Sequence, residues 1–324
     1  MRPDARKFIE GENAKAKPDP EKKTDPKPKK TEPVREIEAE EVKPAISTGD
    51  ITPENRDLTI KRFKSIIDEA KTPKDFKSIM EKIAPMSKTV SVRMDASPEI
   101  IRPRLKSLTE LFADYNVGYN VDKFRLSSGS RAHGFVKRNV LTGRIIEANF
   151  GHTSDKFMHR KRYDEDGINL GRAKSAVDEA NIESATAVHE FAHTLTDYTV
   201  YSYSRRLVQR DGKDPDTVKD HAFWSEMEKL KKEYFSIMRP LKLEIAQKRY
   251  KFRLGDKLSD AERKKLEREI KDLEKQGSEI YLGDYASTNI DEFLAEAFTE
   301  YKLSSKPSKY AKAVGKLVDK YFKK

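Results

Sequence analysis

The spacing of apolar residues along the chain divides it into three parts. Residues 1–50 interleave prolines with charged residues and have few apolar positions, which predicts a disordered leader outside the fold. Residues 51–118 then show apolar positions at helical spacing in three stretches, and each stretch begins at a Thr-Pro or Ser-Pro pair. These helices are predicted at 52–71, 72–84 and 97–114, so we expect a helical segment before the main domain.

The third part, residues 119–324, begins with a period of two and continues with helical periods. Alternation of apolar and polar residues predicts strands at 122–128, 132–140 and 143–150, with a hairpin turn between the last two. Residues 151–178 are rich in glycine and charge, which is typical of a loop. Helical spacing then returns in six segments: 182–200, 217–238, 240–252, 258–276, 289–302 and 307–322. We therefore expect an α+β domain with a small mixed sheet and a charged helical insertion at about 217–276.

The composition restricts the chemistry and the location of this chain. There is no cysteine, so a zinc ion would have to be held by histidine and carboxylate side chains. The first residues show no secretory signal, and no run approaches the roughly 18 apolar residues that span a bilayer. We therefore expect a protein that is made in the cytoplasm and has no membrane span.

The net charge is +11, and it does not by itself indicate a partner. The lysines are spread along predicted helices, as on solvated helix faces, and no nucleic-acid-binding motif accompanies them. No nucleic-acid partner is therefore expected. The leader at 1–50 is instead a candidate tether to a partner protein or a virion.

The stretch ATAVHEFAHTL, residues 185–195, contains a metal-binding pattern. His189 and His193 are four residues apart, so a helix places both imidazoles on one face, and Glu190 projects beside them. In this arrangement a zinc ion acidifies a water molecule, and the glutamate takes the proton. The pattern would arise by accident in roughly one chain in a hundred, but the residues around it are apolar on nearly every side of the helix. Buried histidines and a buried glutamate need partners, and a metal ion supplies one.

A catalytic zinc ion needs a third protein ligand. Thr196 and Thr199 occupy the positions at which the longer histidine motif has glycine and histidine, so that form is excluded. The segment YASTNIDEFLAEAFTEY, residues 285–301, offers Glu292 and Glu296, four residues apart on a predicted helix. Asn289 is a candidate N-cap of that helix, so the alternative is that Glu292 only closes a capping box with Asn289.

The two segments together resemble the catalytic domain of anthrax lethal factor and related gluzincin-type zinc metallopeptidases, including some encoded by phages and mobile elements. The first matching segment is His189-Glu190-Phe191 with His193. The second is Tyr285-x-x-Thr288-Asn289-x-x-Glu292-Phe293-x-Ala295-Glu296-Ala297-Phe298. The resemblance implies a zincin-like fold and a zinc-dependent endopeptidase that acts on a peptide or protein substrate.

The resemblance also implies a role for each matching residue. His189, His193 and Glu292 would ligate one Zn²⁺ per chain, and Glu190 would be the general base. Tyr285 would donate its hydroxyl to the oxyanion of the tetrahedral intermediate, a role that its chemistry suits. The alternative for Tyr285 is an ordinary place in the core.

Two further carboxylates would orient the ligand histidines, namely Glu296 and Asp197. Asp197 shares a helix face with His193, and its alternative is a surface or capping role. The segment between His193 and Glu292 is 98 residues long, about twice the length expected from the resemblance, and the insertion at about 217–276 accounts for the excess. The strand at 143–150 is the candidate edge strand for pairing with a bound peptide, and its alternative is a core strand.

One competing hypothesis concerns function rather than fold. A phage or mobile-element structural or assembly protein could keep a zincin-like fold without catalysis, with a zinc ion that only stabilises it. Glu190 and Tyr285 argue against this alternative, because a structural zinc ion needs neither.

Overall fold

The computed structural model describes residues 42–117, 121–127, 134–153, 177–211, 221–254 and 258–324. The chain from Val42 to Lys324 forms one compact unit. The helices are α1 (Arg56–Glu69), α2 (Pro73–Ile83), α3 (Pro98–Asp114), α5 (Ala185–Leu195), α6 (Tyr198–Asp211), α7 (His221–Leu254), α8 (Asp260–Ser278), α9 (Ile290–Leu303) and α10 (Lys309–Phe322). The strands are β1 (Ser87–Val92), β2 (Val121–Leu126), β3 (Phe135–Arg138) and β4 (Ile145–Asn149), and short 3-10 turns are η1 (Thr48–Asp50), η2 (Glu179–Ser184) and η4 (Tyr285–Ser287).

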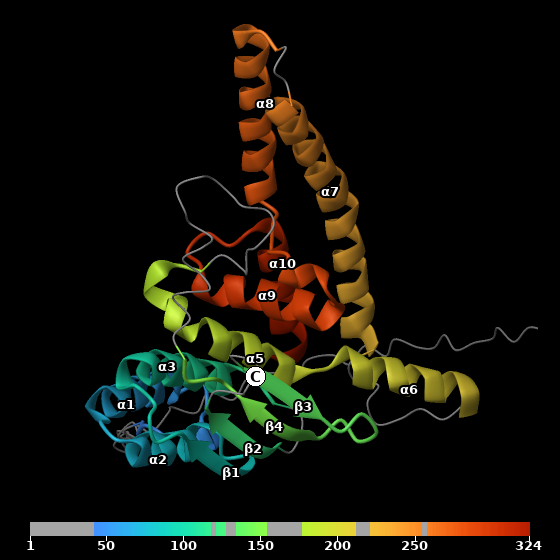
Figure 1. The fold of residues 1–324 in the computed structure, drawn as a ribbon. Helices are drawn as coiled ribbons and strands as arrows, with labels where there is room; N and C mark the ends of the chain where they lie inside the picture. Colours follow the sequence, from blue (N-terminus) through green and yellow to red (C-terminus); the bar gives the residue numbers. More distant parts are fainter. Residues whose placement is uncertain (1–41, 118–120, 128–133, 154–176, 212–220, 255–257) are drawn as a thin grey trace, which may run out of the picture. The chain divides into compact units, whose positions relative to one another are not determined.

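The four strands form one small mixed sheet, which confirms the predicted α+β class. The strand order is β1-β2-β4-β3, with β1, β2 and β4 parallel and β3 antiparallel to β4 at the edge. Helices α3 and α5 lie against one face of the sheet, and α9 and α10 lie beyond α5 (Figure 1). The helix α5, which carries the HEFAH sequence, is thus enclosed between a sheet and two further helices.

An aromatic cluster joins the sheet to α3 and α5. Phe112 of α3 contacts Phe124 of β2 and Phe191 of α5, with ring centroids 5.5 Å and 5.0 Å apart. Phe150, which follows β4, stacks on Phe124 at 5.4 Å. All four rings are fully buried or nearly so. Burial of this size contributes several kcal/mol and fixes how α5 lies on the sheet.

Arg104 of α3 links three segments of backbone. Its side chain is fully buried, and its guanidinium donates to the carbonyl oxygens of Glu183, Phe150 and Thr153 at 2.8, 3.1 and 2.6 Å. These carbonyls lie in η2, which leads into α5, and in the segment after β4. A planar fork with five donors suits this task, because one side chain satisfies several buried acceptors.

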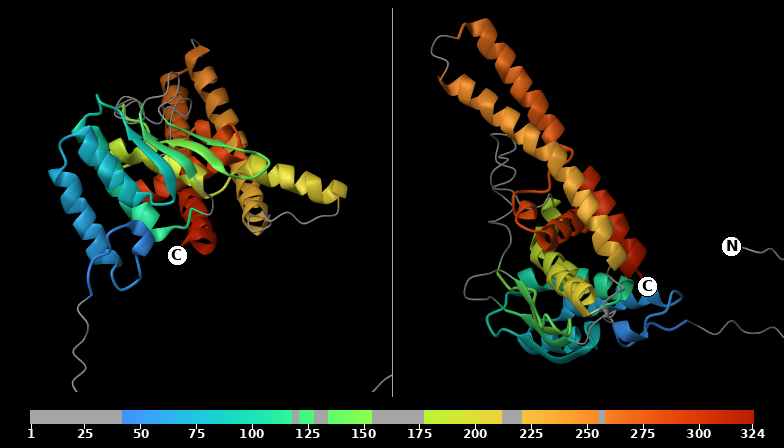
Figure 2. Two further views of the ribbon diagram at one scale, coloured as in Figure 1. Left: turned by 90° about the horizontal axis from the view of Figure 1, so that it is seen from below. Right: turned by 90° about the vertical axis from the view of Figure 1, so that its right-hand side faces the viewer.

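Helices α7 and α8 form a long antiparallel hairpin that projects from the body (Figure 2). Lys248 and Arg249 of α7 form ion pairs with Glu269 and Glu274 of α8, at 2.7 Å and 2.5 Å. α8 begins with a capping box, since Ser259 and Glu262 exchange both cap hydrogen bonds. This hairpin occupies the segment in which the charged helical insertion is predicted. No helix in the described ranges is long and apolar enough to cross a bilayer.

The structure differs from the predicted boundaries at the N-terminal side. Most of the predicted leader, residues 1–41, lies outside the described residues, but residues 42–50 belong to the compact unit. There the backbone N–H of Ala45 donates to Thr59 Oγ1, and the Thr48 hydroxyl donates to the Ile83 carbonyl. The segment 51–118 is not purely helical either, because it contains β1, which pairs with β2. The sheet therefore crosses the predicted boundary at residue 118.

Two helix predictions also need correction. The segments 217–238 and 240–252 are one helix, α7, which continues through Pro240. Met238 and Leu241 are buried on either side of this proline, so packing compensates for the missing hydrogen bond. Conversely, the predicted helix 182–200 is interrupted at Thr196, whose backbone is extended, and α6 begins two residues later.

Replacing Arg104 with methionine tests the link between α3, η2 and the end of β4. Arg104→Met keeps the volume but leaves three buried carbonyls without their donor, so the free energy of unfolding should fall by about 3–5 kcal/mol. Chemical denaturation measures this change. The matched control is Arg62→Met, because exposed Arg62 donates to a single carbonyl, that of Ala45. Equal losses in the two variants would contradict the role given to Arg104.

Candidate metal centre

Helix α5 places two histidines and a glutamate in the interior. Ten of its eleven residues are buried, and only His193 is partly exposed. Phe191 packs on the sheet side, as described above, while His189 and Glu190 are 8% and 7% exposed. A helix with apolar residues all round is buried by its neighbours, so its polar side chains have to find partners there.

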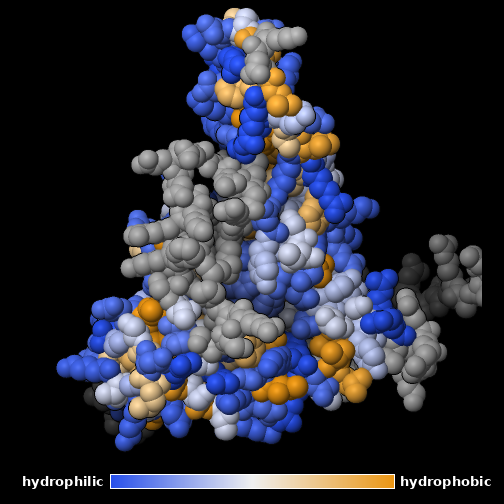
Figure 3. Space-filling model, viewed as in Figure 1, coloured by the Kyte–Doolittle hydropathy of each residue, from blue (hydrophilic) through white to orange (hydrophobic). Residues whose placement is uncertain are grey.

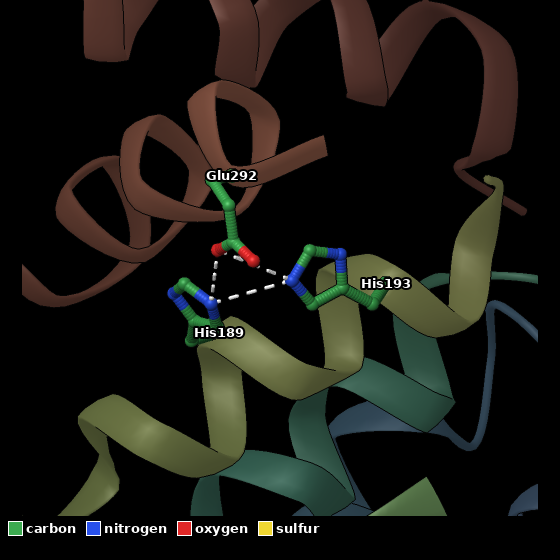
Figure 4. A group of neighbouring side chains, drawn as sticks. All are labelled: His189, His193 and Glu292. Carbon is green, nitrogen blue, oxygen red and sulfur yellow. Dashed lines mark hydrogen bonds and ion pairs between the residues drawn. The ribbon is translucent and has the colours of Figure 1, made fainter. Parts of the chain in front are cut away.

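Helix α9 supplies the partner from the other side. The Asn289 side chain accepts a hydrogen bond from the Glu292 backbone N–H at 2.9 Å, so Asn289 is the N-cap as predicted. The Glu292 carboxylate points away from this cap and toward His189 and His193 of α5 (Figure 4). Capping and facing the histidines are therefore compatible, since the first uses the backbone of Glu292 and the second its side chain.

The three side chains bring three ligand atoms close together. His189 Nε2 lies 3.3 Å from His193 Nε2 and 3.0 Å from Glu292 Oε2, and His193 Nε2 lies 3.6 Å from Glu292 Oε2. Tetrahedral zinc with ligand bonds of about 2.0–2.1 Å separates its ligand atoms by about 3.3 Å. In the part of the chain that the structure describes, these residues are the group positioned to hold a metal ion. The separations and the donor types fit a zinc ion.

The charges of the group also fit a cation. Glu292 Oε2 is buried and meets the geometry of a hydrogen bond with no described residue, although it lies within ion-pair distance of both imidazoles. Burial would raise the pKa of Glu292, but the two histidines outweigh it and hold that pKa well below its ordinary value. Glu190 and Glu296 are buried nearby, so carboxylates outnumber imidazoles. A divalent cation would balance this excess of negative charge.

Glu296 lies beside His189, on which the resemblance implies that it acts. Its Oε1 lies 3.2 Å from His189 Nδ1, and its side chain is 1% exposed. Burial works against protonation of His189, but the neighbouring carboxylates of Glu292 and Glu296 raise its pKa to about 10. With Nδ1 facing Glu296, Nε2 is directed at the shared point between the helices. A carboxylate in this position fixes the ring and makes the other nitrogen a better ligand.

A pocket of about 360 Å³ opens on this group. Its lining includes Glu190 and Tyr285 as well as the three candidate ligands. Tyr285 is 43% exposed, which rules out the alternative of a core tyrosine, and its ring lies 6.0 Å from that of His189. Burial of the hydroxyl and the charge of Glu292 raise the pKa of Tyr285 to about 12, so the phenol keeps its proton and remains a donor.

The edge strand β3 forms one wall of this pocket, with Gly134, Phe135 and Val136. This corrects the prediction of the edge strand: the strand at 143–150 is β4, which lies between β2 and β3. The core-strand alternative is therefore the right one for that segment. Which strand forms an edge depends on pairing between distant segments, and the local sequence does not determine it.

Gly134 contacts the predicted general base. A Cβ atom on Gly134 would lie 2.5 Å from Glu190 Cγ and 2.8 Å from Thr186 Cγ2, closer than real Cβ contacts. The chain that enters β3 therefore passes directly over Glu190, and only glycine fits there. The sequence signal for this position was a single glycine in a predicted strand, which often marks a close approach of backbone.

Arg138 fastens β3 to the end of α5. Its side chain is 2% exposed, and it donates to the carbonyl oxygens of Gly143 and His193, both at 2.8 Å. A cation at the C-terminal end of a helix satisfies a carbonyl that has no partner within the helix and interacts favourably with the helix dipole. Arg138 thus holds the pocket wall against the residue that carries one of the ligand imidazoles. The sequence analysis did not identify it.

Asp197 occupies the capping position rather than a position on His193. Its Oδ1 accepts from the backbone N–H groups of Thr199 and Val200 at 2.8 and 3.1 Å, at the start of α6. Its Oδ2 lies 3.9 Å from Arg138 Nε. Asp197 still lines the pocket, together with Asp291, which was not predicted. Burial and the like charge of Asp197 raise the pKa of Asp291 to about 6.

The two other histidines in the described residues, His152 and His221, do not join the group. His152 is next to Asp95, with 3.7 Å between Nε2 and Oδ1, and His221 packs against the ring of Tyr201. His133 and His159 lie outside the described residues. Comparison with protein-family models, curated proteins and solved structures gives no match for this chain.

Replacing Glu296 with glutamine tests whether this carboxylate increases the zinc affinity of the site through His189. Glu296→Gln keeps the shape but removes the charge beside His189 Nδ1, so zinc affinity should fall about 10–100-fold. Competition with a chromophoric chelator measures that affinity. The matched control is Glu300→Gln, because Glu300 is equally buried one turn further along α9 and accepts from the Ser308 N–H instead. If both variants bind zinc like the wild type, Glu296 does not act on His189.

Proposed function

We propose that this chain is a zinc-dependent endopeptidase of the gluzincin type with a zincin-like fold. The observation that carries the proposal is the meeting of His189, His193 and Glu292 beside Glu190 in one open pocket. The motif resemblance supports it from the sequence side. A zinc ion held by these three residues would polarise the substrate carbonyl and acidify a water molecule.

The remaining chemistry belongs to side chains of the pocket. Glu190 lines the pocket beside the ligand group, where its carboxylate can take a proton from the attacking water and pass it to the leaving amine. Tyr285 retains its hydroxyl proton at neutral pH and can donate it in a hydrogen bond to the developing oxyanion. Glu190 is buried, so water screens its charge less, and its electrostatic interactions with groups in the pocket are stronger than they would be at the surface.

The substrate that best suits this pocket is an extended peptide. Within the described residues β3 is an edge strand that pairs with β4 alone, and Phe135 and Val136 border the pocket. A peptide in extended conformation can add to such an edge through backbone hydrogen bonds while its side chains alternate between wall and solvent. This mode of binding recognises the backbone, so it supports peptide-bond hydrolysis more directly than hydrolysis of a small molecule.

Metal analysis tests the centre itself. Purified wild-type protein should contain about one zinc ion per chain, and His193→Ala should lose it because only two ligands remain. Glu292→Gln should bind zinc at least about 10-fold more weakly. The matched control is His221→Ala, since His221 lies on α7 and packs against a tyrosine ring. A wild-type protein that binds no zinc would refute the proposal, and unchanged affinity in Glu292→Gln would remove Glu292 from the ligand set.

Cleavage of a peptide library tests the reaction. Glu190→Gln should keep zinc and lower the cleavage rate by about 10²–10⁴-fold, because the amide cannot accept the proton. Mass spectrometry of the products measures the rate and the sequence preference. A wild-type protein that holds zinc yet cleaves no library peptide would favour the competing hypothesis of a phage or mobile-element assembly protein with a structural zinc ion.

A further inference from the structure

The outward face of the α7–α8 hairpin carries exposed apolar side chains. Leu243, Tyr250 and Leu254 are 60%, 68% and 62% exposed. At about 100° per residue, their spacing places all three on one side of α7. Leu241 and Ile245 are buried on the opposite side. The hairpin projects from the body, and apolar and hydrophilic side chains alternate along it (Figure 3).

Cations flank this apolar stripe. Arg239, Lys251 and Arg253 are exposed, and no ion pair joins them to an acidic residue of the described chain. Lys248 and Arg249, in contrast, are paired with α8. Near the tip the excess of positive charge is large, since residues 248–254 and 258–268 contain eight Lys or Arg and three Asp or Glu. These cations repel one another, so a function that uses them together needs an anionic surface.

We propose that this hairpin binds an anionic lipid surface. Leu243, Tyr250 and Leu254 would enter the boundary between headgroups and acyl chains, and the flanking cations would pair with acidic headgroups. An interfacial helix combines these two features, an apolar stripe and a basic rim. Each cation near such a surface strengthens binding about fivefold.

The two leucines distinguish this ligand from other polyanions. Nucleic acid would use the cations and could stack a base on Tyr250, but aliphatic side chains add little to such binding. Burial at a lipid boundary, in contrast, stabilises aliphatic and aromatic side chains alike. A second copy of the chain would bring two positively charged faces together, which opposes self-association.

Vesicle co-sedimentation of the full chain tests this proposal. Vesicles of phosphatidylcholine with about 30% phosphatidylserine should retain the protein at about 0.1 M salt, and vesicles of phosphatidylcholine alone should not. Replacing Arg239, Lys251 and Arg253 with glutamine should weaken binding about 100-fold, at about fivefold per charge. Replacing Leu243, Tyr250 and Leu254 with serine should weaken it at least about 10-fold.

A charge-matched variant separates a local site from net charge. Lys61, Lys74 and Lys82 are exposed on α1 and α2, and replacing these three with glutamine changes the net charge equally. This variant should bind the acidic vesicles like the wild type. Equal losses in both charge variants, or no binding of acidic vesicles by the wild type, would overturn the proposal. A second result would also overturn it. In that result the serine variant still binds both the vesicles and a single-stranded oligonucleotide, whereas the glutamine variant at 239, 251 and 253 no longer binds the oligonucleotide.

Discussion

The contact between α5 and α9 is the constraint on which the candidate centre depends. α5 is enclosed by the sheet, α3 and α9, and its ionisable side chains line the pocket. Glu292 and Glu296, one turn apart on α9, approach the two nitrogens of His189 from different sides. A shift of α9 by one turn would separate these partners and leave buried charges uncompensated, at a cost of several kcal/mol. The same packing therefore stabilises the fold and assembles the ligands.

The pocket wall depends on a second set of contacts, which join it to the backbone at the end of α5 and to the side chain of Glu190. Arg138 holds β3 to the end of α5, and Gly134 allows the chain before β3 to lie directly on Glu190. The strand and the helix are thus joined at both ends of the stretch that faces the pocket. A wall held in this way stays at a constant distance from the ligands, which favours preorganisation over induced closure.

Local sequence patterns predicted the features that depend on neighbours along the chain. Helical periodicity located α1 to α3 and α8 to α10, and the i, i+4 spacing of His189 and His193 indicated a shared ligand point.

Sequence patterns failed to predict the structure where contacts between distant segments determine it. The strand β1 escaped notice because Ser87–Val92 is largely polar and half exposed, and it becomes a strand by pairing with β2. Pro240 suggested a break, but both halves of α7 pack on the protein. Asp197 shares a helical spacing with His193, yet the chain leaves the helix at Thr196 and turns Asp197 into a cap.

The chain that leaves the α7–α8 hairpin contacts the middle of α7. The Leu282 backbone N–H donates to the hydroxyl of Tyr234, and Lys242 is paired with Asp284, so the chain returns to the middle of α7 before it reaches α9. Contacts within a helical hairpin are local in sequence, and such contacts form early during folding. Once the hairpin has formed, the loop that still separates His193 from Glu292 is much shorter than the 98 residues of the primary sequence. The hairpin can therefore lengthen, shorten or change its surface during evolution without altering how His189 and His193 meet Glu292.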